Sequence, residues 1–335
     1  MEIGSDRPPL SVWVVSDGRA GIENQALGLA EAIQRLTPAA ITVKRIRWRR
    51  AFDRLPSALK ASWMLDLASD PTEPAEGERW PDLWIATGRA TLPLSARVRH
   101  RSNGRTFVVQ TQDPRWRMDA YDLVVAPAHD LAAGPNVLSI TGSPHRVTPA
   151  RLAESAAAFE GALSLLPRPR VAALIGGRSM AFDLPDAHAA GLADQIAAAV
   201  TQAGGSLMLT FSRRTPEAAK QAMSARLAHL PGLIWDGTGA NPYFAFLQFA
   251  DHVLVTEDSA NMAAEAASTG KPVHILPMVA LKPAGKFARL HADLRERGAA
   301  RPFDGTLEGW TYEPLNETER AARAVLERLA ASGAR

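Results

Sequence analysis

Cysteine is absent from the 335 residues of the chain. This excludes disulfides, thiolate metal sites and a cysteine nucleophile, and it is typical of proteins from reducing compartments. Long apolar runs are absent too, since no stretch approaches the roughly 18 residues that a membrane-spanning helix needs. The first residues, MEIGSDRPPLSVWVVS, lack the basic start and long apolar core of a signal peptide. We therefore expect a cytoplasmic protein, either free or peripheral to the inner face of the membrane.

Several catalytic signatures are missing as well. The eight histidines are scattered, and none forms a His-x3-His pair or joins a carboxylate cluster of known ligand spacing. A G-x-S-x-G nucleophile elbow is absent. The glycine-rich turn near the start has neither the dinucleotide fingerprint nor the Lys-Ser/Thr of a P-loop. The sequence therefore predicts no metal and no bound cofactor.

The net charge is only +3, but the surplus of basic residues lies in the first half of the chain. It is concentrated in KRIRWRRAFDRLPSALK (44–60), which has seven basic residues and a single acid, Asp53. A solvated helix face, a site for an anionic acceptor and a surface for acidic lipid are all compatible with this composition. A nucleic acid is a further candidate, but the small net charge speaks against it. We expect no nucleic-acid partner, and the sequence does not identify a protein partner.

The length predicts two domains of about 150 residues each. In both halves, short apolar runs alternate with stretches of helical periodicity, which is typical of parallel doubly wound sheets. We predict strands at residues 10–16, 41–48, 82–88, 106–112, 122–127, 137–141, 171–177, 206–212, 232–237, 252–258 and 272–278. We predict helices at residues 25–36, 151–166, 191–204, 215–229, 242–250, 259–269, 286–297 and 316–332.

These elements form two Rossmann-like series. We assign residues 1–150 to an N-terminal domain and 151–170 to a helix and a linker, PRPR. Residues 171–315 make the C-terminal domain, and 316–335 a final helix with Asn316 as its cap.

Ligands of such sheets bind beyond the carboxyl ends of the strands, against helix N-termini. The strongest candidate site follows the strand HVLVTED, where Asp258, Ser259, Ala260 and Asn261 form a strand-to-helix turn. Backbone N–H groups and the helix dipole favour an anion such as a diphosphate there. Glu265, about two turns into the helix, is a candidate acceptor for two ribose hydroxyls. Ser259 would also serve as a plain helix cap, and Glu265 as a solvated surface residue.

Two other turns of the C-terminal domain are candidates for the same ligand. Gly176 and Gly177 end the strand VAALIGG and permit close backbone approach, and Arg178 follows where a phosphate or base would lie. The segment SRRTP offers a charge-assisted anion site, although its arginine pair would equally cap surface carbonyls. Its candidate residues are Ser212, Arg213 and Thr215.

Three turns of the N-terminal domain carry the candidates for the acceptor side. The carboxylates that would serve as catalytic base are Asp17, Glu23 and Asp113. The residues around them that would contact the acceptor are Gly18, Arg19, Gly21, Arg89 and Arg115. Asp113 precedes a proline, so a simple turn would also explain it.

The segment PYFAFLQFADHVLVTEDSANMAAEAASTGKPVHILPM (242–278) resembles the donor-site region of GT-B glycosyltransferases, especially the peptidoglycan N-acetylglucosaminyltransferase. Over about residues 10–310, the chain more closely resembles the mitochondrial-fission family of plants and their alphaproteobacterial relatives. That resemblance rests on SDGRAGIENQALGLAEA, VQTQDPR, GSPHRVT, IGG, SRRTP, NPYFAFL, TEDSANMAAEAASTGKPV and KFARLH.

The resemblance implies an α/β, GT-B-like fold in which two Rossmann-like doubly wound domains face each other across a cleft. By the transferase pattern, Glu265 would bind ribose, Ser259–Asn261 would meet the diphosphate, and the Gly176-Gly177 turn would open the donor domain. The transferase has a histidine after its N-terminal glycines as candidate base. Here Glu23 stands near that place, so one of the three carboxylates of the acceptor side would have to serve.

Two functions follow from these expectations. The first is a metal-independent glycosyltransferase that takes a nucleotide sugar as donor and uses a carboxylate to deprotonate the acceptor. The second is a non-catalytic binding protein at a membrane surface, because plant members of the family resemble adaptors that recruit a dynamin-related fission protein to mitochondria. A carboxylate that faces the donor would distinguish the two. The nucleotide, the sugar and the acceptor are not identified by the sequence.

Overall fold

The computed structural model describes residues 8–283 and 285–333, and the chain divides into two compact units. The first unit runs to Arg146 and takes in the C-terminal segment from Asn316. The second unit is Val147–Leu315. The last helix therefore packs with the beginning of the chain, rather than with the domain that precedes it in sequence.

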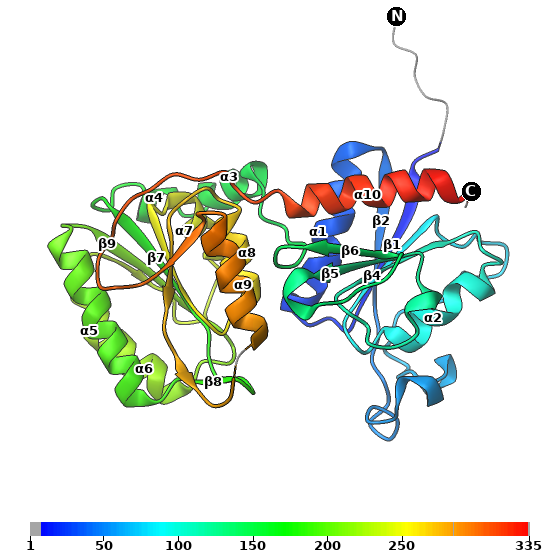
Figure 1. The fold of residues 1–335 in the computed structure, drawn as a ribbon, viewed down its shortest axis with the longest axis horizontal. Coiled ribbons are helices and arrows are strands. Elements are labelled where there is room, and N and C mark those ends of the chain that lie inside the picture. Colours follow the sequence, from blue (N-terminus) through cyan, green and yellow to red (C-terminus); the bar gives the residue numbers. More distant parts are fainter. Residues whose placement is uncertain (1–7, 284, 334–335) are drawn as a thin grey trace, which may run out of the picture. The chain divides into compact units, whose positions relative to one another are not determined.

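The first unit contains a parallel six-stranded sheet of order β2-β1-β3-β4-β5-β6 (Figure 1). Because the order reverses between β1 and β3, the carboxyl ends of these two strands form a topological switch point. The strands are β1 (Leu10–Ser16), β2 (Ala39–Arg45), β3 (Leu83–Thr87), β4 (Phe107–Thr111), β5 (Leu123–Pro127) and β6 (Val137–Ile140).

Helices cover both faces of this sheet, because side chains that alternate along each strand point to opposite faces. On one face, Val12 and Val14 pack with α1 (Ala20–Leu36) and α10 (Glu317–Ser332). Figure 1 shows α10 beside α1. On the other face, Trp13 packs with α2 (Leu92–Arg101).

The second unit contains another parallel six-stranded sheet, of order β10-β9-β7-β11-β12-β14. Numbered within the unit, this is the 3-2-1-4-5-6 order of dinucleotide-binding sheets, with its switch point between β7 and β11. A short antiparallel pair, β8 with β13, lies apart from the main sheet. The strands are β7 (Arg170–Ile175), β8 (Phe182–Asp183), β9 (Ser206–Phe211), β10 (Gly232–Ile234), β11 (His252–Thr256), β12 (Val273–Leu276), β13 (Val279–Ala280) and β14 (Ala300–Pro302).

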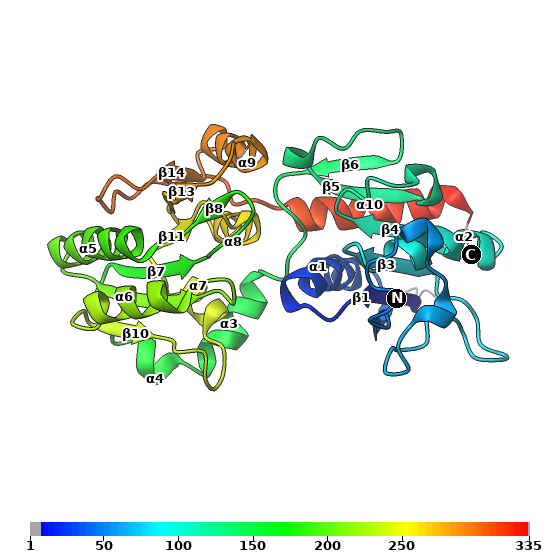
Figure 2. The same cartoon turned by 90° about the horizontal axis from the view of Figure 1, so that it is seen from below.

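Two apolar clusters fill the space between this sheet and its helices. Val171 and Ala173 face α5 and α6, which lie side by side in both views (Figures 1 and 2). Ala172 and Leu174 face the layer that holds α3, α7 and α8. The helices of the unit are α3 (Pro149–Ala157), α4 (Glu160–Leu163), α5 (Asp186–Gln202), α6 (Glu217–Leu227), α7 (Tyr243–Phe249), α8 (Ala260–Ala267) and α9 (Gly285–Glu296).

All the predicted strands are present, with ends that differ by up to three residues. One predicted helix, 151–166, is instead two, because the helix breaks at Ala158 and Phe159. The elements α2, β8, β13 and β14 were not predicted. No described helix is both long and apolar enough to cross a membrane.

Candidate functional site

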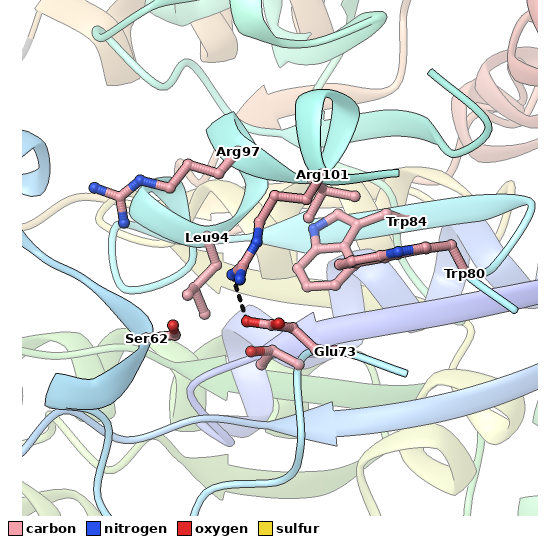
Figure 3. A pocket seen from close by; sticks show the side chains of 9 residues that line it. Ser62, Glu73, Trp80, Trp84, Leu94, Arg97 and Arg101 are labelled. Atoms are coloured by element: carbon pink, nitrogen blue, oxygen red, sulfur yellow. Dashed lines mark hydrogen bonds and ion pairs between the residues drawn. The ribbon is translucent and has the colours of Figure 1, made fainter. Parts of the chain in front are cut away.

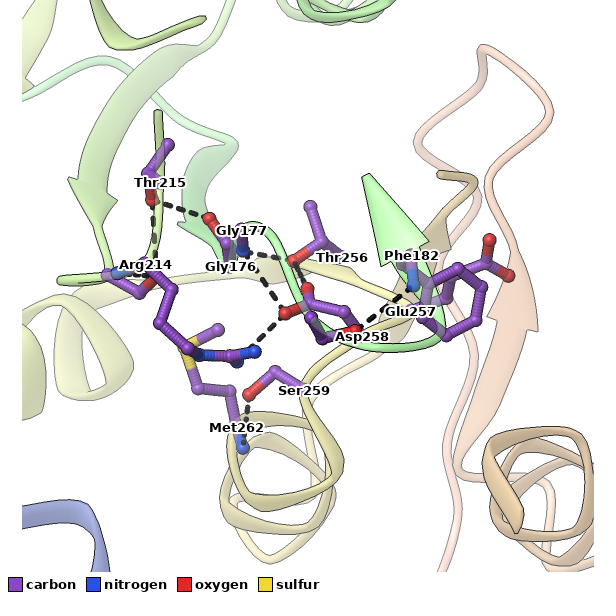
Figure 4. A network of polar contacts seen from close by, with 12 residues as sticks. Gly176, Gly177, Phe182, Arg214, Thr215, Thr256, Glu257, Asp258, Ser259 and Met262 are labelled. Atoms are coloured by element: carbon purple, nitrogen blue, oxygen red, sulfur yellow. Dashed lines mark hydrogen bonds and ion pairs between the residues drawn. The ribbon is translucent and has the colours of Figure 1, made fainter. Parts of the chain in front are cut away.

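The carboxyl ends of β7 and β11 meet at the switch point of the second sheet, where ligands of such folds bind. The backbone N–H of Gly176, after β7, donates to Thr256 Oγ1 at 2.7 Å. The N–H of Gly177 donates to Asp258 Oδ2 at 3.1 Å. Figure 4 shows these bonds joining the two turns into one network.

Asp258 lies at the centre of this network. Its side chain is fully buried, and its Oδ1 accepts a hydrogen bond from the Thr256 hydroxyl at 2.8 Å. Its Oδ2 accepts a charge-assisted bond from Arg214 Nη2, also at 2.8 Å. A buried carboxylate is tolerated only with partners of this kind. Both carboxylate oxygens of Asp258 are bound to groups of the protein itself. We therefore infer that Asp258 positions Arg214 and does not contact a ligand.

Arg214 is the cation of the site. About 47% of its side chain is exposed although one end is held by Asp258. Its backbone is fixed as well, since its N–H donates to Ser212 Oγ at 3.2 Å and its carbonyl accepts from the Arg178 N–H at 3.0 Å. A guanidinium fixed at one end and exposed at the other is suited to bind an anion.

Other candidates of the segment SRRTP have different places. Arg213 is exposed, and Thr215 is buried. The Thr215 hydroxyl donates to the carbonyl oxygens of Ile175 and Gly176, so it fastens the SRRTP turn to the end of β7. Ser212 lies 3.2 Å from Thr215, oxygen to oxygen. The arginine at the network is thus the second of the pair, whereas the sequence had indicated the first.

The two glycines are required by the packing of the protein itself. A Cβ atom on Gly176 would lie 1.9 Å from Asp258 Oδ1, and one on Gly177 would lie 2.2 Å from the carbonyl group of Arg214. Both N–H groups are used inside the network. Arg178, directly after them, is exposed and lies 3.8 Å from Asp183.

Helix α8 begins beside this network (Figure 4). Ser259 caps it, since its hydroxyl accepts from the Met262 N–H at 3.4 Å. Ala260 and Asn261 form the start of the first turn. The positive end of the helix dipole and the Arg214 guanidinium therefore lie at the same switch point, and both favour an anion.

Glu265 lies on α8 and is paired with a residue of α7. The Tyr243 hydroxyl donates to Glu265 Oε2. Burial raises the pKa of the Glu265 carboxyl to about 7, although the bond from Tyr243 opposes this. Burial and the neighbouring carboxylate likewise raise the pKa of Tyr243 well above its ordinary value. A carboxyl with a pKa strongly raised by burial is a common mark of a functional site.

In the first unit, Glu23 lies beyond the end of β1 and is almost fully buried. It accepts from the Ser16 hydroxyl at 2.7 Å and from two nitrogens of Arg45, both at 2.9 Å. The Arg45 guanidinium holds the pKa of Glu23 below its usual value. Glu23 is therefore a firmly ionised carboxylate with its oxygens in use.

Asp17 and Asp113 are also paired with arginines. Asp17 binds the Arg19 guanidinium at 2.6 Å. Asp113 accepts the Arg115 N–H at 2.9 Å, and its other oxygen lies 3.5 Å from the Arg115 side chain. Both arginines are more than 60% exposed, so water competes for these pairs.

The acceptor-side candidates share one edge of the first sheet, because they follow the neighbouring strands β1, β3 and β4. Gly18 has φ +76° and opens the turn after β1. Gly21 lies in the first turn of α1, and Arg89 is exposed after β3. Among residues 8–283 and 285–333, no three His, Asp or Glu side chains gather as a metal site would require.

The sequence profile of the family described as mitochondrial fission ELM1 matches residues 20–329. The chain belongs to the mitochondrial fission ELM1 family. It is 32% identical over 288 residues to mitochondrial fission protein ELM1 of Arabidopsis thaliana, a match that covers 76% of this chain and 65% of the plant protein. It is 25% identical to the uncharacterized protein RP120 of Rickettsia prowazekii, over 94% of this chain and 98% of that protein. The resemblance seen in the sequence is thus confirmed.

Solved structures show what fold this ELM1-family chain has. A putative UDP-N-acetylglucosamine 2-epimerase from Listeria monocytogenes matches with a TM-score of 0.52 and 13% identity, over 98% of this chain and 90% of its own. The UDP-GlcNAc 2-epimerase of Methanocaldococcus jannaschii matches with a TM-score of 0.51 and 12% identity, over 96% and 92%. These likenesses confirm the GT-B-like fold, and at such low identity they carry no conclusion about activity.

Proposed function

We propose that this ELM1-family protein binds a nucleotide sugar on its second unit and is a glycosyltransferase that uses no metal. The observation that carries the proposal is the Arg214 guanidinium, held by the buried Asp258 at the switch point of a 3-2-1-4-5-6 sheet. The beginning of α8 supplies a second positive group there. Together they are suited to a diphosphate.

The rest of the nucleotide would lie along α8. The Tyr243 hydroxyl occupies one oxygen of Glu265, which leaves the other for a ribose hydroxyl. As the glycosyl bond breaks, negative charge develops on the departing nucleoside diphosphate. Arg214 and the helix terminus would stabilise that charge, because donors fixed in advance need no reorganisation during the reaction.

Transfer also needs a base for the acceptor hydroxyl. Glu23 is a poor candidate, because its pKa is lowered and Arg45 and Ser16 occupy both of its oxygens. Asp17 and Asp113 are better candidates, because each is paired with a largely exposed arginine that an acceptor can displace. Of these, we assign the role to Asp113, whose hydrogen bond comes from a backbone N–H and leaves one oxygen with only a 3.5 Å contact.

The second function is a non-catalytic binding protein, such as an adaptor at a membrane. One observation favours it: each of the three candidate bases is paired with an arginine. The name of the Arabidopsis relative, a fission protein, also fits a role in assembly. Under this proposal the second unit still binds a nucleotide, and no sugar is transferred.

A thermal-shift screen with UDP, GDP, ADP and CMP tests the shared first step. We expect one of the four to raise the melting temperature, and Glu265→Gln to lose that rise while Glu154→Gln, an exposed glutamate, keeps it. A screen in which no nucleotide stabilises the protein would contradict both functions. Release of nucleoside diphosphate from the matching nucleotide sugar separates them: turnover that Asp113→Asn abolishes supports the transferase, and tight binding without turnover supports the adaptor.

A further inference from the structure

The connection between β2 and β3 exposes an unusual set of apolar side chains. Leu59 is 62% exposed, Trp63 is 63% exposed and Leu67 is 94% exposed. These are three of the eight large apolar side chains that are exposed in the described part of the chain, and they lie within nine residues. Scattered exposed apolar residues are normal, but a cluster marks an interaction site.

The segment that carries them, residues 46–70, is anchored to the first unit. Trp48 is buried, and its indole N–H donates to the Ala90 carbonyl at 3.0 Å. Trp48 also forms an antiparallel bridge with Leu65. The Lys60 ammonium lies 4.9 Å from the centre of the Trp48 ring and donates to the Asp53 carbonyl at 2.7 Å.

A second attachment follows the segment. Glu73 forms an ion pair with Arg101 of α2, at a small pocket whose wall includes Trp80, Trp84 and Leu94 (Figure 3). The exposed residues are therefore held between two anchors, the buried Trp48 and this ion pair.

Trp63 has the geometry of an interfacial residue. Its ring packs edge-on against Phe52, with centroids 5.4 Å apart and planes at 75°, so one side of the indole is supported while the rest meets solvent. Tryptophan is enriched at the headgroup level of membranes, because its ring is apolar and its N–H is a donor.

Basic side chains are frequent in the same segment. Arg50 and Arg54 are exposed, and neither has an ion pair within the described residues. Arg47 pairs with Asp66 at 3.1 Å, and the Arg49 guanidinium is bound to the Leu65 carbonyl at 3.0 Å. Two unpaired cations and three exposed apolar side chains within one short segment complement a surface that is negatively charged outside and apolar beneath.

We propose that residues 46–70 dock the protein on the surface of an anionic phospholipid bilayer. Trp63, Leu59 and Leu67 enter the boundary between headgroups and acyl chains, and Arg50 and Arg54 bind lipid phosphates. Both contributions are needed, because a single weak anchor gives only marginal membrane binding. The proposal does not depend on nucleotide binding.

Co-sedimentation with vesicles tests this with the full chain. Vesicles of phosphatidylcholine and phosphatidylglycerol should bind the wild type, and vesicles of phosphatidylcholine alone should not. Trp63→Ser/Leu67→Ser should bind vesicles at least about tenfold more weakly, since each substitution removes an apolar side chain that docking would bury in the bilayer. The matched control Leu131→Ser/Leu165→Ser removes two exposed leucines elsewhere and should bind as the wild type does.

The cationic half of the surface has its own pair of variants. Arg50→Gln/Arg54→Gln should weaken binding about 25-fold, on a scale of about fivefold per basic residue at an anionic surface. The control Arg226→Gln/Arg295→Gln removes the same charge from the second unit and should bind nearly as the wild type does.

Three results would overturn the docking proposal. The first is that the wild type does not bind anionic vesicles. The second is that the control variants lose as much vesicle affinity as Trp63→Ser/Leu67→Ser and Arg50→Gln/Arg54→Gln, the variants of the docking segment. The third is that the protein binds RNA or itself, and that the variants of the docking segment lose this binding but still bind vesicles. Each variant is also measured by thermal shift with the stabilising nucleotide. The variants of the docking segment leave Arg214 and Glu265 in place, so nucleotide should still raise their melting temperature. An unchanged rise separates a failure of docking from a failure of the proposed function.

Discussion

The replacement of Glu265 by glutamine should stabilise the free protein and at the same time remove nucleotide binding. The folded protein raises the pKa of this carboxyl from its ordinary 4.5 to about 7. The folded state therefore holds a proton that the unfolded chain releases, and stability is lost as the pH rises through this range. Glutamine has no charge to desolvate, and its amide oxygen can still accept from the Tyr243 hydroxyl.

The size of the effect follows from the shift. A pKa raised from 4.5 to about 7 sets an upper limit of about 3.5 kcal/mol, at about 1.4 kcal/mol per pKa unit. The difference in the free energy of unfolding between Glu265→Gln and wild type should be largest above pH 7. It should decline as the pH falls from 7 to 4.5, and it should vanish below pH 4.5. At pH 8 the melting temperature of the second unit should rise, by at most roughly 7 to 14 °C at about 2 to 4 °C per kcal/mol.

Melting curves of wild type and variant from pH 4 to 8 measure this directly. Glu154→Gln, whose side chain is about 76% exposed, is the matched control and should follow the wild type at every pH. A Glu265→Gln variant that is less stable than wild type at pH 8, or whose advantage does not depend on pH, would refute the reasoning.

Two more predictions concern packing and buried histidines. Gly177→Ala should prevent the second unit from folding, since its Cβ would lie 2.2 Å from a backbone carbonyl group. Gly191→Ala, in an open helical position, is the control and should raise the melting temperature slightly. Equal melting temperatures of the two variants would contradict the packing argument. Burial lowers the pKa of His145 and of His274 to about 4, so both are neutral in the folded protein, and stability should fall as the pH drops from 6.5 to 4. In denaturant titrations at several pH values, His274→Gln should lose less stability than the wild type between pH 6.5 and 4. A variant that loses as much stability as the wild type would contradict this prediction.

The strands of both sheets could be predicted because buried parallel strands are short, continuous apolar runs. The helix α2 was missed because LPLSARVRHR has a proline near its start and four basic or imidazole side chains, which obscure its apolar face. The placement of the last helix beside α1 was beyond local patterns. After Leu315 the chain leaves the second unit, and the residues from Asn316 on pack in the first unit. Local sequence patterns do not show with which unit a helix packs.

The sequence predicted which turns of the second unit carry the candidate residues, but it did not predict the contacts between them. Strand ends and glycines indicated the turns after β7 and β11, and the switch point places both turns together. The sequence could not show that Asp258 is buried, or that Arg214 rather than Arg213 reaches it, because adjacent residues of a turn point in different directions. Tyr243 was missed as the partner of Glu265 because the two residues are 22 positions apart and lie on different helices.

The central claim is that Arg214, held by Asp258, binds the diphosphate of a nucleotide. Calorimetric titration of the best nucleoside diphosphate into wild type, Arg214→Gln and Arg213→Gln tests it most directly, with the melting temperature of each free variant as the control for folding. Loss of a charge-assisted bond predicts at least a tenfold weaker affinity for Arg214→Gln and an affinity close to wild type for Arg213→Gln. Equal affinities in the two variants, with both folded, would contradict the claim.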